Sequence, residues 1–376
     1  MENTNNNPSH KRHLQDKENK CKGRKLQPIF TDLQQPETFT NHIQELQKEV
    51  EAKKQNKGLF KVKTANEWLN EAKNTPVPEM LFGEFWHENE ICVLFADSNL
   101  GKSILAVQIA DSISKGQQVQ GFKLEAKKQP VLYFDFELNA KQFELRYSVK
   151  SQTQKVFEDH YSFDDNFKRI EIDPDTEIPK ESDFEKYLIQ SIEQSIIETG
   201  AKVLIIDNIT YLKTEMEQSK NALPLIQYLK ALKSKYNLSI LTLAHTPKRD
   251  LSRPISQNDL QGSKMIFNFI DSCFAIGQST TDKNIRYIKQ IKARNTAMIY
   301  DTENVIVCQV DKPRNFLAFE LLNFGAEREH LKQITEKDRE SIIEQAKELS
   351  EKGHSQRTIS KELNISLGSV NKYLNM

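Results

Sequence analysis

The chain has 376 residues, and its 53 Lys and Arg balance its 53 Asp and Glu, so the formal net charge is zero. This length allows one large domain with smaller attachments, and the balanced charge excludes a protein that coats nucleic acid or membrane over its whole surface. No secretory signal and no apolar stretch near the roughly 20 residues of a membrane span is found, so we expect a soluble, cytoplasmic protein. The four cysteines have no CxxC spacing and are typical of reduced core thiols: Cys21, Cys92, Cys273 and Cys308.

Residues 1–60 are polar and rich in Asn, Gln, Lys and Glu. They cannot bury enough apolar surface to offset the entropy of ordering, so we expect a disordered arm with at most a short helix over His42–Glu51. Large apolar side chains begin near Ala65, and residues 61–325 are expected to form one α/β domain.

Short apolar runs alternate with amphipathic helical patterns in this domain, which is typical of βαβ units around a mostly parallel sheet. The predicted strands are Ile91–Ala96, Val131–Phe136, Val203–Ile206 and Ser239–Ala244. The predicted helices are Ser103–Lys115, Asn139–Val149, Asp183–Glu198 and Asn221–Lys235. Four later runs without long helices between them predict antiparallel strands that extend the sheet: Ser272–Gly277, Ile285–Lys292, Asn304–Gln309 and Leu317–Leu322.

A candidate phosphate-binding loop joins the first predicted strand to the first predicted helix. Small residues let successive N–H groups point inward, a lysine reaches the outer phosphates, and a hydroxyl binds Mg²⁺. We therefore predict that eight residues bind ATP: Ala96, Asp97, Ser98, Asn99, Leu100, Gly101, Lys102 and Ser103. Ala96 stands where the GxxxxGK[ST] pattern has its first glycine, which adds a methyl group and leaves the lysine and hydroxyl functions intact.

Polar residues at the ends of three other strands complete the predicted site. Asp207 follows Val203–Ile206 and is expected to hold Mg²⁺ together with Ser103. Glu137 is predicted to be the catalytic base, with Asp135 as a structural neighbour on the same strand face. His245 follows another strand and is either a catalytic sensor or a structural histidine.

These residues resemble the RecA-like superfamily and, within it, the RepA-type hexameric helicases and their mobile-element relatives, over about residues 65–325. The supporting motifs are Ala96–Ser103, Tyr133–Glu137, Leu204–Asp207, Ala244–Thr246, Gln261–Ser263 and Lys292–Asn295. The resemblance implies a homo-oligomer, possibly a hexameric ring, in which each ATP lies between neighbouring subunits. Lys292 and Arg294 would then reach a neighbour's γ-phosphate, although a solvated basic strand explains them equally well.

The resemblance also implies that loops after the strands face a central channel and contact single-stranded DNA. The loop Thr246–Pro254 offers three cations to phosphates: Lys248, Arg249 and Arg253. It has no aromatic residue for base stacking, and an ordinary surface loop is an equally good interpretation.

The C-terminal segment is expected to form a linker over 326–336 and an all-α helix-turn-helix over 337–376. Gly353 ends one helix, and Ser355 and Ser366 are predicted to cap the next two. The run from Lys352 to Leu374 resembles the DNA-binding domains of resolvase-type recombinases, with Ser360 and Asn364 as mild departures. Duplex contacts are expected from Gln356, Arg357, Ser366, Leu367, Ser369, Asn371 and Lys372. A helical protein-interaction module is the alternative.

Three functions remain open at this stage. The first is a DNA-dependent ATPase, an oligomeric helicase or DNA-remodelling motor in the replication or mobilisation of a plasmid or mobile element. The second is an ATP-gated regulator that recognises a duplex site without translocating. The third is a scaffold that binds ATP without turnover, against which Glu137 argues.

Overall fold

The structure is a computed structural model and describes residues 61–177, 184–208, 222–247, 249–261, 263–333, 336–363 and 365–376. The predicted N-terminal arm with its helix over His42–Glu51 lies outside the described residues. The same holds for Cys21 and for Asp183 and Asn221, the first residues of two predicted helices.

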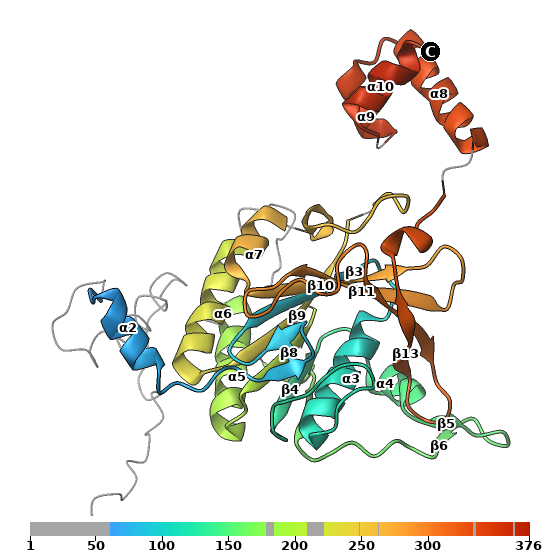
Figure 1. The fold of residues 1–376 in the computed structure, drawn as a ribbon. Helices are drawn as coiled ribbons and strands as arrows, with labels where there is room; N and C mark the ends of the chain where they lie inside the picture. Colours follow the sequence, from blue (N-terminus) through green and yellow to red (C-terminus); the bar gives the residue numbers. More distant parts are fainter. Residues whose placement is uncertain are drawn as a thin grey trace, which may run out of the picture.

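Nine strands of the described chain form one sheet, in the order β13-β12-β11-β10-β3-β9-β8-β4-β7 (Figure 1). The six strands from β10 to β7 run parallel, whereas β11, β12 and β13 continue the sheet antiparallel. This confirms the predicted α/β class and its antiparallel extension. The strands are β3 (Ile91–Ala96), β4 (Val131–Asp135), β7 (Phe167–Ile170), β8 (Val203–Asp207), β9 (Ser239–His245), β10 (Ser272–Gln278), β11 (Ile285–Lys292), β12 (Val305–Asp311) and β13 (Ala318–Gly325).

Helices cover both faces of the parallel strands (Figure 1). One face packs against α3 (Lys102–Lys115) and α4 (Ala140–Arg146), and the other against α5 (Phe184–Thr199), α6 (Ala222–Tyr236) and α7 (Ser263–Phe269). All six residues of β3 are buried, because a strand covered on both sides needs an apolar run and not an alternating pattern. The cysteines of the sheet are buried free thiols, as predicted: Cys92, Cys273 and Cys308.

Several small elements were not predicted from the sequence. They are α2 (Ala65–Ala72), the hairpins β1–β2 (Met80–Phe82, Trp86–His87) and β5–β6 (Val149–Lys150, Phe157–Glu158), and the turns η3 (Gln257–Asp259) and η4 (Glu327–Glu329). Strand β7 was missed as well, since it lies at the sheet edge and mixes Lys168 and Arg169 with apolar residues. Helix α4 ends at Arg146 and not at Val149, because the chain leaves helical geometry at Tyr147. No helix in the described ranges combines the length and apolar character needed to cross a bilayer.

The C-terminal residues form three helices around a separate small core: α8 (Glu336–Glu351), α9 (Gln356–Glu362) and α10 (Leu367–Leu374). Gly353 has a positive φ of 82° after α8, which a glycine adopts without strain. Ser355 and Ser366 accept the N–H groups of Thr358 and Ser369, so both predicted caps are confirmed. The predicted turn residue Asn364 lies outside the described residues.

Gly277 in β10 is required by the ring of Tyr287, its partner in β11. A Cβ at position 277 would lie 2.0 Å from the ring carbon Cζ, and both strands are buried in the sheet. We expect Gly277→Ala to lower the free energy of unfolding by about 3 kcal/mol, as overpacking of a buried site does. Urea unfolding measures this loss. Gly368→Ala in α10, where the nearest side-chain atom is 3.8 Å away, is the control and should change stability by less than about 1 kcal/mol; an equal loss in both variants would contradict the steric argument.

Candidate nucleotide-binding site

The loop between β3 and α3 has the backbone geometry of a phosphate-binding loop. Asn99 and Gly101 have positive φ values of 63° and 95°, which turn the chain sharply before the helix begins at Lys102. A Cβ at Gly101 would lie 2.9 Å from the ring of Phe319 in β13, so glycine is needed here for two independent reasons. The free N–H groups at the start of α3 therefore open toward the loop, where they favour an anion.

The ammonium of Lys102 lies inside this loop. Its Nζ donates to the carbonyl oxygens of Ala96 (3.0 Å) and Asp97 (3.2 Å) and lies 3.3 Å from Nδ1 of His245. Burial lowers the pKa of Lys102, although Glu137 and the nearby aspartates oppose that shift. Phosphate oxygens placed among these groups would replace the backbone carbonyls as acceptors and favour the charged form.

Asp207 ends β8, which is separated from β3 by β9. The residue is 1% exposed, and its carboxylate accepts hydrogen bonds from the Tyr133 hydroxyl (2.7 Å) and from Ser103. Burial raises the pKa of Asp207 to about 6. A buried carboxylate beside a hydroxyl at the start of α3 is the donor set expected for the water shell of Mg²⁺. Ser103 and Asp207 thus fit the predicted metal.

Asp135 and Glu137 do not share a strand face as the sequence analysis expected. Strand β4 ends at Asp135, because one oxygen of its side chain accepts the N–H groups of Glu137 (3.1 Å) and Leu138 (2.9 Å). The other oxygen accepts from Nε of Arg169 at 2.8 Å. Asp135 is therefore a buried residue that shapes the turn, and this turn places Glu137 at the site.

Glu137 lies between Asn208 and His245. Asn208 donates to its Oε1 at 3.0 Å, and Nε2 of His245 lies 3.5 Å from the same oxygen. The hydrogen bond from His245 lowers the pKa of Glu137 to about 2, while partial burial opposes that shift. The side chain remains 40% exposed, so an ionised carboxylate is accessible to water.

His245 connects Lys102 with Glu137. An ammonium only donates hydrogen bonds, so Nδ1 of His245 acts as the acceptor and the ring proton is on Nε2, which faces Glu137. Asn208 is the residue of this cluster that sequence reasoning missed. Its one sequence signal is its position directly after Asp207, since the ends of β4 and β8 are neighbours in the sheet.

Comparison with known proteins identifies the family. A family model described as an AAA domain matches residues 60–250, the segment that contains the whole cluster around Lys102. The chain belongs to the AAA domain family. No curated protein matches it at a significant level. Membership in the AAA domain family makes this an ATPase-type P-loop protein and indicates a nucleotide-dependent activity.

Two predicted residues lie away from the AAA-domain site of their own chain. Lys292 ends β11, which is antiparallel to β10 and pairs with the start of that strand, whereas the phosphate-binding loop follows the end of β3. Lys292 bonds to the carbonyl of Phe267, and Arg294 donates to Asp271 at 2.9 Å with its side chain 49% exposed. Both cations therefore lie at the end where the parallel strands begin, whereas the phosphate-binding loop lies where those strands end.

The loop after β9 differs from its predicted role at Arg249. Its side chain is 5% exposed, and its Nε lies 3.5 Å from Oδ2 of Asp97, so it is not presented to DNA as expected. The reason is that the loop folds back against the phosphate-binding loop. Arg253 is exposed and pairs with Asp250 at 3.0 Å, and Lys248 lies outside the described residues.

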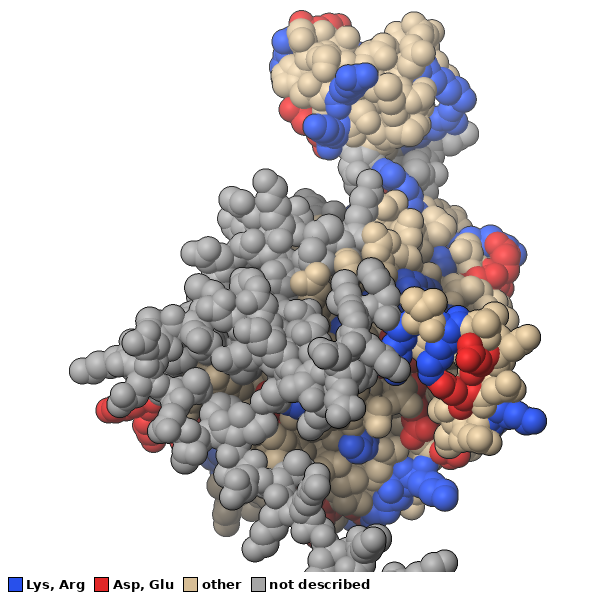
Figure 2. Space-filling view, turned by 90° about the vertical axis from the view of Figure 1, so that its left-hand side faces the viewer, with Lys and Arg blue, Asp and Glu red and all other residues tan. Residues whose placement is uncertain are grey.

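The predicted duplex contacts lie on the second and third helices of the C-terminal unit. Gln356, Arg357, Leu367, Asn371 and Lys372 are exposed. The hydroxyls of Ser366 and Ser369 pair with each other at 2.8 Å at the start of α10. Figure 2 shows lysine and arginine side chains on the surface of this unit.

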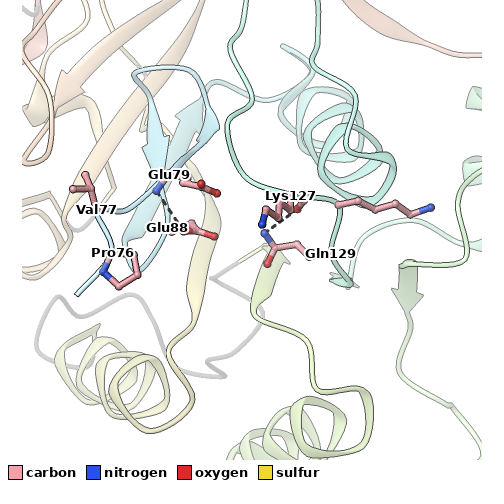
Figure 3. Close-up of a pocket in the computed structure, with 7 residues that line it drawn as sticks. Pro76, Val77, Glu79, Glu88, Lys127 and Gln129 are labelled. Atoms are coloured by element: carbon pink, nitrogen blue, oxygen red, sulfur yellow. Dashed lines mark hydrogen bonds between the residues drawn. The ribbon is translucent and has the colours of Figure 1, made fainter. Parts of the chain in front are cut away.

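A surface hollow lies at the other end of α3 (Figure 3). It is lined by Pro76, Val77, Glu79, Glu88, Lys127, Lys128 and Gln129. Within it, Glu79 donates its N–H to Glu88 and Gln129 donates to the carbonyl of Lys127, each at 3.3 Å. Lys128 packs against Gly116, the residue that ends α3, so the hollow is not part of the nucleotide site.

Proposed function

We propose that the protein hydrolyses ATP with Mg²⁺ in a site formed between neighbouring subunits, and that DNA stimulates this hydrolysis. The observation that carries the proposal is the position of the Glu137 carboxylate, which is 40% exposed and held by Asn208 and His245 beside Lys102. A scaffold that only binds nucleotide does not need an acidic group so placed.

Each residue of the cluster has a distinct role in this proposal. Lys102 and the N–H groups at the start of α3 bind the outer phosphates. Ser103 and Asp207 hold the hydrated Mg²⁺, which supplies positive charge against the charge that develops on the γ-phosphate. Glu137 orients the attacking water and accepts its proton, and His245 and Asn208 position Glu137.

An oligomer would bring Lys292 and Arg294 to a second site. They lie at the end of the parallel strands opposite the phosphate-binding loop, so in this proposal they serve the nucleotide of a neighbouring subunit and not that of their own chain. This arrangement supports an oligomer of the RepA-type hexameric helicase kind, acting in the replication or mobilisation of a plasmid or mobile element. The cations would stabilise the transferring phosphoryl group in trans.

The charges of the C-terminal unit favour DNA as the partner of α9 and α10. Residues 355–376 contain Arg357, Lys361 and Lys372 against one acidic residue, Glu362. Helix α8 carries most of the acidic residues of the unit, so α9 and α10 form the side better suited to phosphates. We propose that this unit binds duplex DNA and that Arg253 of the ATPase domain contacts a single strand.

The same unit favours a second candidate function. A translocating ring needs no site-specific duplex module, so the C-terminal helices also fit an ATP-gated regulator that binds a DNA site and does not move along it. Both functions share the nucleotide site and differ in which form of DNA changes turnover.

Steady-state ATPase assays at fixed salt test the proposal, with no DNA, with single strands and with duplex. We expect single strands to raise kcat about tenfold, a size typical of coupling between two sites, and Lys102→Ala to remove turnover. Strong stimulation would be followed by a strand-displacement assay. Turnover that is indifferent to single strands, together with tight binding of one duplex sequence, would replace the motor with the regulator.

A further inference from the structure

Arg249 connects the phosphate-binding loop to the chain that follows β9. Its guanidinium pairs with Asp97 at 3.5 Å, hydrogen bonds to the hydroxyl of Tyr287, and donates to the carbonyl of Arg253 at 3.2 Å. The Arg249 side chain is 5% exposed, whereas that of Asp97 is 30% exposed, so the guanidinium side of the pair is the one shielded from water. A guanidinium with so little water around it responds more strongly to a charge placed next to it than an exposed one does.

The far end of the 249–255 segment is fixed. Ile255 donates its N–H to Glu327 at 2.6 Å, and its carbonyl accepts from Lys289 at 2.8 Å. Glu327 is fully buried and pairs with Lys289 at 2.5 Å. The hydroxyl of Tyr287 donates to the same carboxylate, and its ring lies between Gly277 and His330. The carbonyl of Leu251 also accepts the N–H of Lys332 at 3.0 Å, so the segment is held at its middle and at Ile255, and its Arg249 end is the one that adjoins the phosphate-binding loop.

The Arg249 end of the segment lies next to the phosphate-binding loop, where a bound nucleotide would add negative charge. Asp97 directly follows β3, and its carbonyl accepts from Lys102 at 3.2 Å. Thr246, three residues before Arg249, donates its N–H to Ala96 at 3.2 Å. A triphosphate in the loop adds several negative charges beside a guanidinium that has little water to screen it. The attraction between Arg249 and Asp97 then competes with an attraction to the phosphates.

We infer that Arg249 is a positioning residue that transmits occupancy of the phosphate-binding loop to the 249–255 segment. The inference rests on the proposed nucleotide site and adds its regulation: the segment proposed to carry a DNA contact at Arg253 changes conformation when ATP binds. Arginine suits the role because its planar fork holds Asp97 and Tyr287 at the same time, which a single ammonium does less well. By linkage, a ligand on this segment would alter ATP affinity to the same extent.

Hydrogen exchange of the 249–255 amides in the full chain tests the inference, with and without Mg²⁺ and a non-hydrolysable ATP analogue. In the wild type we expect saturating analogue to change exchange rates by about fivefold or more, the lower range of measured couplings. Arg249→Met keeps the apolar stem and removes the charge, and it should reduce the change to less than about twofold. Arg249→Lys should retain part of it. Arg253→Met, in the same segment but not in contact with Asp97, should respond like the wild type.

Calorimetric titration of the analogue on the same samples distinguishes a failure of this inference from a failure of the proposed nucleotide site. If the wild type and Arg249→Met both bind analogue and both change exchange alike, Arg249 does not transmit occupancy and the inference is wrong. If the wild type binds analogue without any change in the 249–255 amides, the inference is wrong as well, while the nucleotide site stands. Absence of binding to the wild type would remove the proposed function and the inference with it.

Discussion

Glu137→Gln is expected to lower kcat for ATP about 10²- to 10⁴-fold, the contribution usual for a positioned proton acceptor. The amide keeps the size of the side chain and can still contact Asn208 and His245, but it cannot accept a proton from water. ATP binding should be nearly unchanged, because within the described residues the Glu137 carboxylate contacts Asn208 and His245 and hydrogen bonds neither to the phosphate-binding loop nor to Asp207. Single-turnover hydrolysis and calorimetric titration measure the two quantities.

The control for this experiment is Glu144→Gln on the neighbouring helix α4. Glu144 pairs with Lys141 and His160 at the surface, so its loss should leave kcat within about twofold of the wild type, as surface changes usually do. If Glu137→Gln turns over ATP within tenfold of the wild type, the proton acceptor is a different residue and the role assigned here to Glu137 is wrong.

Asp207→Asn is expected to stabilise the nucleotide-free protein while it removes magnesium-dependent turnover. Burial raises the folded-state pKa of Asp207 to about 6 from its ordinary value of 3.8, so the ionised form is unfavourable in the folded protein. A shift of this size corresponds to about 3 kcal/mol. This destabilisation is complete above pH 6 and disappears as the pH falls toward 4, because the folded protein then takes up the proton.

Urea unfolding of wild type and Asp207→Asn between pH 4.5 and 8 measures this difference. The variant should be more stable at pH 8, and the gap should narrow steadily with acid. Adding Mg²⁺ and ATP should reverse the order, since bound ligand stabilises only the form that binds it. Asp135→Asn is the matched control with the opposite sign: it leaves Arg169 without its buried partner and should destabilise by about 3–5 kcal/mol. If the two substitutions change the free energy of unfolding equally, burial does not disfavour ionisation of Asp207 and the prediction is wrong.

The sequence predicted the strands well because the central ones are buried on both faces and therefore appear as continuous apolar runs. Strand β3 matches its prediction at both ends, and β8 and β9 are each one residue longer than predicted. Strand β7 was not predicted, because an edge strand is partly exposed to solvent and its mixture of polar and apolar residues resembles that of a loop. The pattern of apolar residues along a strand therefore indicates how many of its faces are packed against other elements.

Prediction of the site residues from the sequence was limited by a different cause. Lys102, Glu137, Asp207 and His245 could be grouped from the sequence, since parallel strands bring their carboxyl ends to one edge of the sheet. Asn208 could not be distinguished from an ordinary loop residue, because its contact to Glu137 depends on the order of strands across the sheet. The burial of Arg249 beside Asp97 could not be predicted for a related reason: local composition does not indicate that a loop folds back and covers one of its cations.

The small core of the C-terminal unit has a consequence for how the protein can change over time. Its fully buried residues are Ala346, Ile359 and Val370, and this cluster shares no side chain with the two clusters that pack the sheet. Substitutions on the exposed side of α10 can therefore accumulate without disturbing the packing around Lys102. The proposed DNA contacts of α10 and the proposed nucleotide site can therefore change independently during evolution.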